Sequence, residues 1–342
     1  MMDAAKLLKN NKALNLIYVD CKDPGYKRKA LKSGFVYLNS QNQIIKNSKI
    51  LDRIKALVIP PNWSEVWICP HENGHIQATG MDQKSRKQYL YHSSWSSFRS
   101  SSKFHLLSNF GKTLPLFRKK LKRDIQRKNL DLTKVCAIAL WVMDETSIRS
   151  GNSFYCKQNG SYGLTTLINK QVKIETDKIF FKYVGKKGVL QQKYLKEKRL
   201  AKLLKTIKDL PGQQLFQYYD EHKKVRPLEA VDLNNYLQEI FDSEITCKTF
   251  RTWNACFYFL DFVVNHEIPS PDKERKELLI SAIDYVAKQL GNSRAVTRKH
   301  YIDPKLIQSY ESKELDKWIS STSSKTAIEQ EKSIHRKLLQ LL

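Results

Sequence analysis

The sequence predicts an α+β protein, with a small β-rich N-terminal domain followed by a larger, mainly helical domain that contains a three-stranded antiparallel sheet. Three observations carry this prediction. Short apolar runs separated by turn residues fill residues 1–95, and a polar, serine-rich stretch follows at residues 96–102. Residues 103–342 mostly show the spacing of apolar side chains that is typical of amphipathic helices. A chain of 342 residues is also long enough for two domains.

Four strands and one helix are expected in the N-terminal domain. The strands are predicted where β-branched and aromatic residues cluster, at residues 16–19, 34–38, 65–69 and 75–79. Asn73-Gly74 stands between the last two runs and is a strong hairpin signal. A helix is predicted over residues 48–56, ahead of Pro60-Pro61. Residues 96–102 are rich in serine and are predicted to form a hinge between the domains.

The second domain is expected to consist of helices around one small sheet. Its helices are predicted at residues 103–127, 132–149, 196–208, 228–241, 246–265, 273–290, 304–310 and 325–341. Its strands are predicted at residues 172–175, 178–184 and 189–193, with turns at 176–177 and 185–188. Serine and lysine are enriched around residues 311–326, which predicts a flexible segment before the last helix.

A large positive charge indicates a polyanionic partner. The chain has 60 lysines and arginines against 34 aspartates and glutamates, a formal net charge of +26. Such a charge repels itself unless a polyanion neutralises it, and DNA or RNA does so through phosphate contacts and counterion release. An anionic membrane is the competing partner, but the longest apolar run, residues 135–143, is too short to span a bilayer. The N-terminus also lacks the apolar core of a signal peptide.

The cysteines and histidines indicate no metal site. The six cysteines are scattered without a CxxC pair, which predicts reduced thiols in an intracellular protein. The eight histidines form no HxxxH pattern, and the sequence contains neither a Walker loop nor a cluster of acidic residues suited to Mg²⁺. We therefore expect chemistry that uses no metal, no ATP and no other cofactor.

Tyr301 ends a strongly basic segment, residues 291–301, that follows a predicted helix. A tyrosine hydroxyl titrates near pH ~10 and is a poor nucleophile at neutral pH. Surrounding cations would change this, because they stabilise both the phenolate and the charge on an attacked phosphate. The alternative is an ordinary half-buried tyrosine after a helix.

Five further residues are candidates to surround Tyr301 in a phosphate-binding site. Arg149 ends a predicted helix, Lys186 sits at a predicted hairpin tip, Lys248 and Arg251 share one face near a helix start, and Asn292 follows Gly291. Arginine binds phosphate bidentately, and a desolvated lysine among cations can serve as a general acid. Each position also has an ordinary structural explanation, such as dipole compensation, a solvated turn lysine or a helix C-cap.

These segments together resemble the small type IB DNA topoisomerases of the bacterial and poxviral kind, over most of the chain. In the first half the resemblance rests on residues 59–63, 66–70, 74–80, 86–92, 103–104 and 110–115. In the second half, the order Arg, hairpin Lys, Lys-x-x-Arg, Asn, Tyr is that of the family's catalytic set. Five elements in this order are far more specific than any one of them.

The resemblance implies a role for each member of this set. Tyr301 would be the nucleophile, forming a 3′-phosphotyrosyl bond and expelling a strand with a 5′-hydroxyl. Arg149 and Arg251 would clamp the non-bridging oxygens of the phosphate. Lys186 would protonate the departing 5′-oxygen, and Lys248 would support Arg251 or the proton relay.

Asn292 departs from the version of the family that carries histidine at this position. An amide can donate a hydrogen bond to a non-bridging oxygen but cannot act as an acid. The resemblance therefore implies hydrogen bonding at Asn292, without proton transfer.

The resemblance also implies a monomer that closes as a clamp around double-stranded DNA, with residues 96–102 as its hinge. The implied DNA-binding residues are Lys84, Arg86, Lys87, Gln88, Tyr89, Tyr91, Lys103 and Tyr155. Basic residues would hold phosphates, while glutamine and tyrosine would touch base edges. The alternative for residues 84–91 is a basic exposed strand with core aromatics.

The implied activity is relaxation of supercoiled DNA by nicking one strand, letting it rotate and resealing it. A tyrosine recombinase is the nearest alternative, but recombinases carry His-x-x-Arg where this chain has Lys248-Thr249-Phe250-Arg251, and their N-terminal domains are usually helical. A non-catalytic basic DNA-binding protein is the third alternative, and the complete catalytic set argues against it. The expected location is intracellular and associated with DNA, in a bacterial cytoplasm and nucleoid, or in a virion or viral factory.

Overall fold

The computed structural model describes residues 8, 14–32, 34–241 and 245–342. The chain divides into two compact units, Met1–Lys103 and Phe104–Leu342. The first unit is rich in strands and the second is mainly helical, which confirms the predicted α+β class. The predicted domain limits at residues 95 and 103 stay a prediction. None of the described helices has the length and apolar character needed to cross a membrane.

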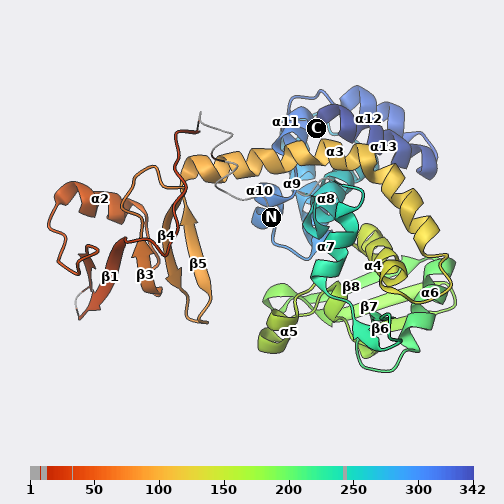
Figure 1. The fold of residues 1–342 in the computed structure, drawn as a ribbon. Coiled ribbons are helices and arrows are strands. Elements are labelled where there is room, and N and C mark those ends of the chain that lie inside the picture. Colours follow the sequence, from red (N-terminus) through yellow and green to blue (C-terminus); the bar gives the residue numbers. More distant parts are fainter. Residues whose placement is uncertain (1–7, 9–13, 33, 242–244) are drawn as a thin grey trace. The chain divides into compact units, whose positions relative to one another are not determined.

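The first unit contains a five-stranded antiparallel sheet with the order β2-β1-β3-β4-β5 (Figure 1). Its strands are β1 Tyr26–Leu31, β2 Gly34–Leu38, β3 Ser64–Ile68, β4 Ile76–Met81 and β5 Lys87–Tyr91. Helix α2, Ser48–Ala56, matches its predicted range and begins at Asn47, whose side chain accepts from the backbone N–H of Ile50. Its Ile54 packs with Val66 and Ile68 in a small core.

Three sequence expectations for this unit need correction. Residues 16–19 form no strand of the sheet, because only Ile17 pairs, through one isolated bridge to Gly74. The connection between β3 and β4 is a seven-residue loop over 69–75, so Asn73-Gly74 is not a tight two-residue hairpin. Strand β1 was not foreseen, since its basic run Lys27-Arg28-Lys29 lacks the apolar pattern of a typical strand. Strand β5 lies within residues 84–91, for which an exposed strand was the alternative.

The serine-rich segment 96–102 is helical and lies within α3, Ser93–Asp124. The predicted helix start at residue 103 is therefore ten residues too late. Trp95 explains the earlier start, because its side chain is buried and packs edge-on against His75, with 5.3 Å between ring centroids. The hinge role of residues 96–102 stays a prediction.

In the residues that the structure describes, the second unit packs ten further helices and two small sheets around one core. Its helices are α4 Leu132–Thr146, α5 Ser153–Asn159, α6 Lys198–Lys208, α7 Ala230–Gln238, α8 Cys247–Val264, α9 Asp272–Leu290, α10 Arg294–His300, α11 Pro304–Glu311, α12 Asp316–Ser323 and α13 Ala327–Leu341. Residues 135–140 of helix α4 are all buried, as expected for a central helix of the core. Helix α12 occupies the segment predicted to be flexible, because Ile319 and Thr322 anchor it in the core.

The predicted three-stranded antiparallel sheet is present, with the order β6-β7-β8. Its strands are β6 Val172–Glu175, β7 Lys178–Val184 and β8 Leu190–Lys196, and one face packs toward α4 and α6 (Figure 1). The alternation in β7 buries Ile179, Phe181 and Tyr183 on that face. A two-stranded sheet of β9, Gln217–Tyr219, and β10, Val225–Pro227, was not predicted.

Candidate active site

Tyr301 lies at the end of the short helix α10, in the core of the second unit. Its backbone N–H donates to the Thr297 carbonyl at 2.9 Å, and its own carbonyl accepts from the Cys256 thiol at 3.5 Å. Only 9% of its surface is exposed. The helix was not predicted, but it fixes the backbone on both sides of the phenol, so Tyr301 is held in one place.

Arg251 lies beside Tyr301 and is 4% exposed. Its guanidinium carbon is 5.5 Å from the centre of the Tyr301 ring. Nη1 donates to the carbonyl of Ser147, at the end of α4, and Nη2 donates to the carbonyl of Leu290, at the end of α9, at 2.8 Å. Cations are favoured at helix C-termini, so two helix ends hold this buried charge in position.

Arg149 and Asn292 meet although 143 positions separate them: Arg149 Nη2 donates to Asn292 Oδ1 at 2.6 Å. Arg149 was predicted to end α4, but the helix ends three residues earlier, at Thr146, because its C-cap Ser147 takes a left-handed conformation (φ 56°). The Arg149 carbonyl instead accepts from Leu164 N–H at 2.7 Å, which fixes this loop. Asn292 follows Gly291, the left-handed C-cap of α9 (φ 61°).

Two polar groups at this junction have no hydrogen-bond partner within the described part of the chain. They are Arg251 Nε and Asn292 Nδ2, and both are buried. Because arginine only donates, the Asn292 oxygen must face Arg149, which leaves its amide nitrogen unpaired. Buried donors without acceptors are costly, and an anion placed between them would satisfy both.

The cations act directly on the phenol of Tyr301. Burial alone raises the pKa of Tyr301, but the positive charges of Arg251, Arg149 and Lys248 outweigh it, so that its pKa lies below the ordinary tyrosine value. Tyr183 faces the same two arginines, yet burial prevails there and raises its pKa to about 12. Of these two buried tyrosines, Tyr301 therefore loses its proton more readily.

The two predicted lysines differ in their relation to this cluster. Lys248 is exposed, but its charge contributes to lowering the Tyr301 pKa. Lys186 is also exposed, at the turn Lys186–Gly188 between β7 and β8. Among the residues that the structure describes, no hydrogen bond joins Lys186 to Tyr301, Arg149 or Arg251. The structure thus groups Arg149 with Asn292 and Arg251 with Tyr301, brings the charge of Lys248 to bear on the phenol, and leaves Lys186 at the hairpin tip.

Lys193 is a neighbour of the cluster that the sequence reading did not single out. It lies on the inward face of β8, and its Nζ donates to the carbonyl of Gln289 in the last turn of α9. Burial, with the positive charge of Arg251 as a second cause, lowers the pKa of Lys193 to about 8. The alternation of side chains along β8 could have identified Lys193, since it places a lysine at a position that points into the core.

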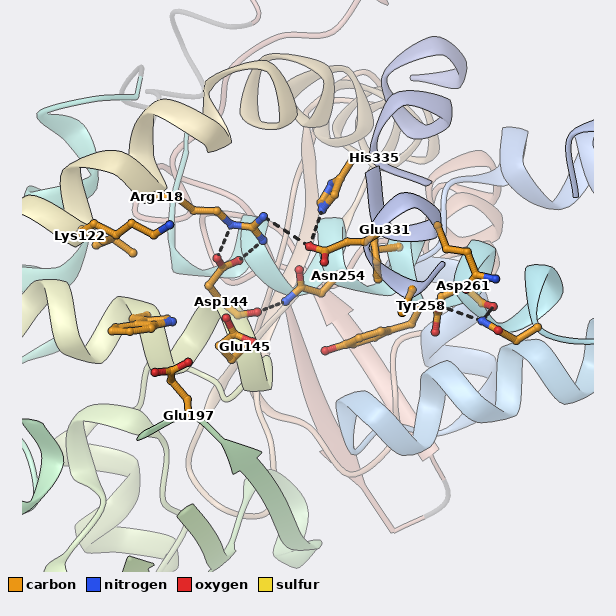
Figure 2. Close-up of a pocket in the computed structure, with 16 residues that line it drawn as sticks. Arg118, Lys122, Asp144, Glu145, Glu197, Asn254, Tyr258, Asp261, Glu331 and His335 are labelled. Atoms are coloured by element: carbon orange, nitrogen blue, oxygen red, sulfur yellow. Dashed lines mark hydrogen bonds and ion pairs between the residues drawn. The ribbon is translucent and has the colours of Figure 1, made fainter. Parts of the chain in front are cut away.

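A polar network behind the cluster supports the C-terminal end of α4. Figure 2 shows Asn254, which donates to the backbone carbonyl of Asp144 at 2.7 Å and to Ser147 Oγ at 2.9 Å. The Asp144 carboxylate accepts from Arg118 Nε at 2.8 Å, beside a cavity of ≈ 740 Å³. This network fixes Ser147, whose carbonyl in turn binds Arg251.

The predicted DNA-binding residues of the first unit cluster on and before β5. The rings of Tyr89 and Tyr91 stack at 5.9 Å and remain 42% and 47% exposed. Arg86 and Gln88 both bond the carboxylate of Asp82, at 2.6 Å and 2.9 Å. Arginine binding lowers the pKa of Asp82 to about 2, so this carboxylate is charged at neutral pH and competes with phosphate for both side chains.

The remaining predicted DNA-binding residues are two lysines at β5 and one residue in each of the helices α3 and α5. Lys87 is exposed, with its Nζ 3.0 Å from Cys21 Sγ and 5.8 Å from the Tyr89 ring centre. Lys84 is exposed in the turn before β5, and Lys103 lies in α3. Tyr155 is 48% exposed in α5 of the second unit. In the described ranges, no group of three histidine, cysteine or acidic side chains is arranged to hold a metal ion.

Comparisons with known proteins match both parts of the chain. A family model for the catalytic core of eukaryotic DNA topoisomerase I matches residues 92–327, and a model for the N-terminal domain of bacterial DNA topoisomerase IB matches residues 34–82. DNA topoisomerase 1B of Acanthamoeba polyphaga mimivirus is 32% identical over 289 residues, covering 82% of this chain and 86% of the relative. DNA topoisomerase I of Monkeypox virus and DNA topoisomerase 1B of Vaccinia virus (strain Copenhagen) are each 25% identical over 290 residues, covering 83% of this chain and 87% of either relative.

Proposed function

The chain belongs to the type IB DNA topoisomerases, and we propose that it relaxes supercoiled duplex DNA through a transient 3′-phosphotyrosyl bond at Tyr301. One observation carries the proposal: two buried donors have no hydrogen-bond partner among the described residues. They are Nε of Arg251, which lies against a tyrosine whose pKa is lowered, and Nδ2 of Asn292, whose oxygen accepts from Arg149. A phosphodiester supplies the missing acceptors and places its phosphorus next to the phenol.

In the proposed reaction, the phenolate oxygen of Tyr301 attacks the phosphorus in line with the departing 5′-oxygen. The new bond joins Tyr301 to the 3′-phosphate, and the bond from phosphorus to the 5′-oxygen breaks. Arg149, Arg251 and Asn292 stabilise the charge on the non-bridging oxygens, most strongly in the transition state.

Lys186 is the proposed general acid for the leaving 5′-oxygen. Its exposed place at the tip of the β7-β8 hairpin allows it to reach the leaving strand of a bound duplex. Lys248 is exposed beside Arg251 and assists through its charge or as a relay for the proton. Religation reverses the steps: the free 5′-hydroxyl attacks the phosphotyrosine, and Tyr301 leaves as phenolate.

The covalent bond conserves the energy of the broken diester, so the proposed cycle consumes no ATP and needs no metal. The test is relaxation of supercoiled plasmid in EDTA without ATP, with topoisomers separated on a gel. A ladder of relaxed topoisomers is the expected result, and a plasmid that stays supercoiled would overturn the proposal. Denaturing the reaction mid-course should trap protein on the 3′ end of the nick, and a 5′ linkage would exclude this mechanism.

The proposed partner is double-stranded DNA, held by a monomeric clamp to which the first unit contributes Tyr89, Tyr91 and the neighbouring basic side chains. Exposed stacked aromatics beside lysine are suited to sugar, base-edge and phosphate contacts. The proposed location is wherever the host keeps this DNA, in a bacterial nucleoid or in a viral factory.

Asn292 gives a prediction that separates its two hydrogen-bonding roles. Replacing it with alanine is expected to slow single-turnover cleavage about 10²-fold, the effect of losing one oxyanion donor. Asn292→Asp keeps an acceptor for Arg149 but removes the donor, so it should be at least as slow as alanine. Asn292→His restores a donor and should cleave faster than either. An aspartate variant with wild-type cleavage would refute the donor role.

Salt dependence tests the clamp residues of the first unit. Removing two phosphate contacts with Lys84→Ala and Lys87→Ala should weaken DNA binding and make the slope of log K against log salt shallower by about 1.8, at ~0.9 per contact. Single-turnover cleavage at saturating protein should be unchanged. The matched control replaces two exposed lysines of α2, Lys49 and Lys55, and should leave the slope as it is. Equal slopes for both double variants would contradict the assignment.

A further inference from the structure

The C-terminal turn of α9 is held by groups from two other elements. A helix leaves its last four carbonyls without intrahelical partners. Here the carbonyls of Ala287 and Lys288 accept from the backbone N–H groups of Asn292 and Gly291. The two that remain, those of Gln289 and Leu290, are bound by a lysine and an arginine from outside the helix.

Lys193 of β8 donates to Gln289, and Arg251 of α8 donates to Leu290. All four terminal carbonyls are therefore satisfied, and two cations sit at the negative end of the helix dipole. The turn they hold leads directly to Asn292. Lys193 therefore holds the turn that leads to Asn292, just as Arg251 does. Among the described residues, no hydrogen bond joins Lys193 to Tyr301 or Arg149.

The hairpin and the turn also pack in direct contact. A Cβ built on Gly291 would collide with the side-chain amide of Gln191, and the φ of 61° independently favours glycine there. Gln191 is buried, pairs with Tyr183 across the sheet and lies two positions before Lys193 on the same strand face. The β7-β8 hairpin, which carries Lys186 at its tip, is therefore fixed against the turn that carries Asn292.

We propose that Lys193 is a positioning residue for DNA cleavage, which ties the β7-β8 hairpin to the C-terminal turn of α9 and so holds Asn292 against Arg149. This inference rests on the proposed function of the cluster. The proposed role of Lys193 differs from packing alone in one respect. Lys193 also brings a positive charge close to Arg251, and that charge acts on a bound phosphate.

Replacing Lys193 with methionine, which keeps the length and removes the donor and the charge, should slow cleavage about 10- to 100-fold, as small misplacements of catalytic groups do. Lys193→Arg keeps both the charge and the donors and should recover most of the rate. Lys196→Met, at an exposed position of the same strand, is the control and should cleave like wild type. The assay is formation of the covalent complex on supercoiled plasmid in a single turnover.

A double-mutant cycle with Asn292 tests the route of the effect. If Lys193 acts through the Asn292 turn, Lys193→Met should cost much less in the Asn292→Ala background than in the wild-type background. Additive losses would overturn the positioning role. DNA binding, measured with each variant in a Tyr301→Phe background, should stay within about twofold of the control, because the proposal concerns the chemical step.

The pH profile supplies a readout that a packing role would not change. Arg251 of α8 is the charged group acting on Lys193, Tyr183 of β7 is neutral below its pKa of about 12, and α9 presents the Gln289 carbonyl. The rates compared are those of covalent complex formation, measured with the protein below the concentration that saturates the DNA. The ratio of the wild-type rate to the Lys193→Arg rate should fall as the pH rises through about 8, because only lysine loses its charge there.

The outcomes separate this inference from the proposed function. A wild-type protein that forms no covalent complex would refute the proposed function itself. A wild-type protein that cleaves while Lys193→Met cleaves equally fast, or a rate ratio that is flat between pH 6 and 10, would overturn the role of Lys193 alone.

Discussion

Replacing Tyr301 with phenylalanine is expected to abolish plasmid relaxation, with a loss of at least about 10⁴-fold in covalent complex formation. The substitution removes one oxygen atom and leaves the ring in the same pocket beside Arg251. Tyr183, the other tyrosine that faces both arginines, is a poor replacement, because its pKa is raised to about 12 while that of Tyr301 is lowered. The measurement is gel relaxation together with trapping of the protein on DNA.

Tyr183→Phe is the matched control for this experiment. Tyr183 is buried and near the same arginines, so its substitution tests whether any phenol in this field matters. We expect relaxation by Tyr183→Phe within about tenfold of wild type. Relaxation by Tyr301→Phe, or a covalent complex that disappears only in Tyr183→Phe, would move the nucleophile to another residue.

The lowered pKa of Tyr301 also predicts a pH dependence. The nucleophile is the deprotonated form, so the rate of cleavage should rise with pH until the phenolate dominates, and it should level off below the pH expected for an ordinary tyrosine. Removing the charge of Lys248, with Lys248→Met, should shift this rise toward higher pH, since that charge helps to lower the pKa. An unshifted profile would contradict the electrostatic account.

Periodicity predicted those parts of the fold in which one side chain pattern repeats. The apolar stretch of α4 and the alternation of β6, β7 and β8 appear where the sequence placed them. Strand β1, YKRKAL, was missed because it is mostly exposed and shows no apolar alternation, although it pairs with both β2 and β3. Likewise, the serines of α3 favour turns locally, yet the buried Trp95 sets the helix start.

For the candidate site, too, the sequence predicted which residues belong to it but not the contacts between them. Residue types and order were enough to propose Tyr301, Arg149, Arg251 and Asn292. The hydrogen bond between Arg149 and Asn292 was not predictable, because it depends on two left-handed caps that turn separate loops toward each other. Lys193 belongs to no motif, and its role becomes visible only when the carbonyls of α9 are counted.

Arg251 combines structural and chemical roles, so its loss should be felt in both. Arg251→Ala leaves the carbonyls of Ser147 and Leu290 without their donor. Each buried carbonyl left unpaired costs about 1–3 kcal/mol, and each kcal/mol lowers the melting temperature of a domain this large by about 2–4 °C. The same change removes the main cation beside Tyr301, so cleavage should fall by ~10³- to 10⁵-fold.

Arg251→Lys separates these two roles. Lysine keeps a positive charge but cannot bond both carbonyls and a phosphate in one fixed plane. We therefore expect a smaller drop in melting temperature for Arg251→Lys than for Arg251→Ala. Its cleavage should stay at least about 10²-fold below wild type, since the fixed orientation of the donors is lost although the charge is kept. Thermal unfolding and single-turnover cleavage, measured on the same preparations, give both quantities. If lysine restored cleavage fully, charge alone would suffice, and the two helix ends that hold Arg251 would serve stability without orienting it for the reaction.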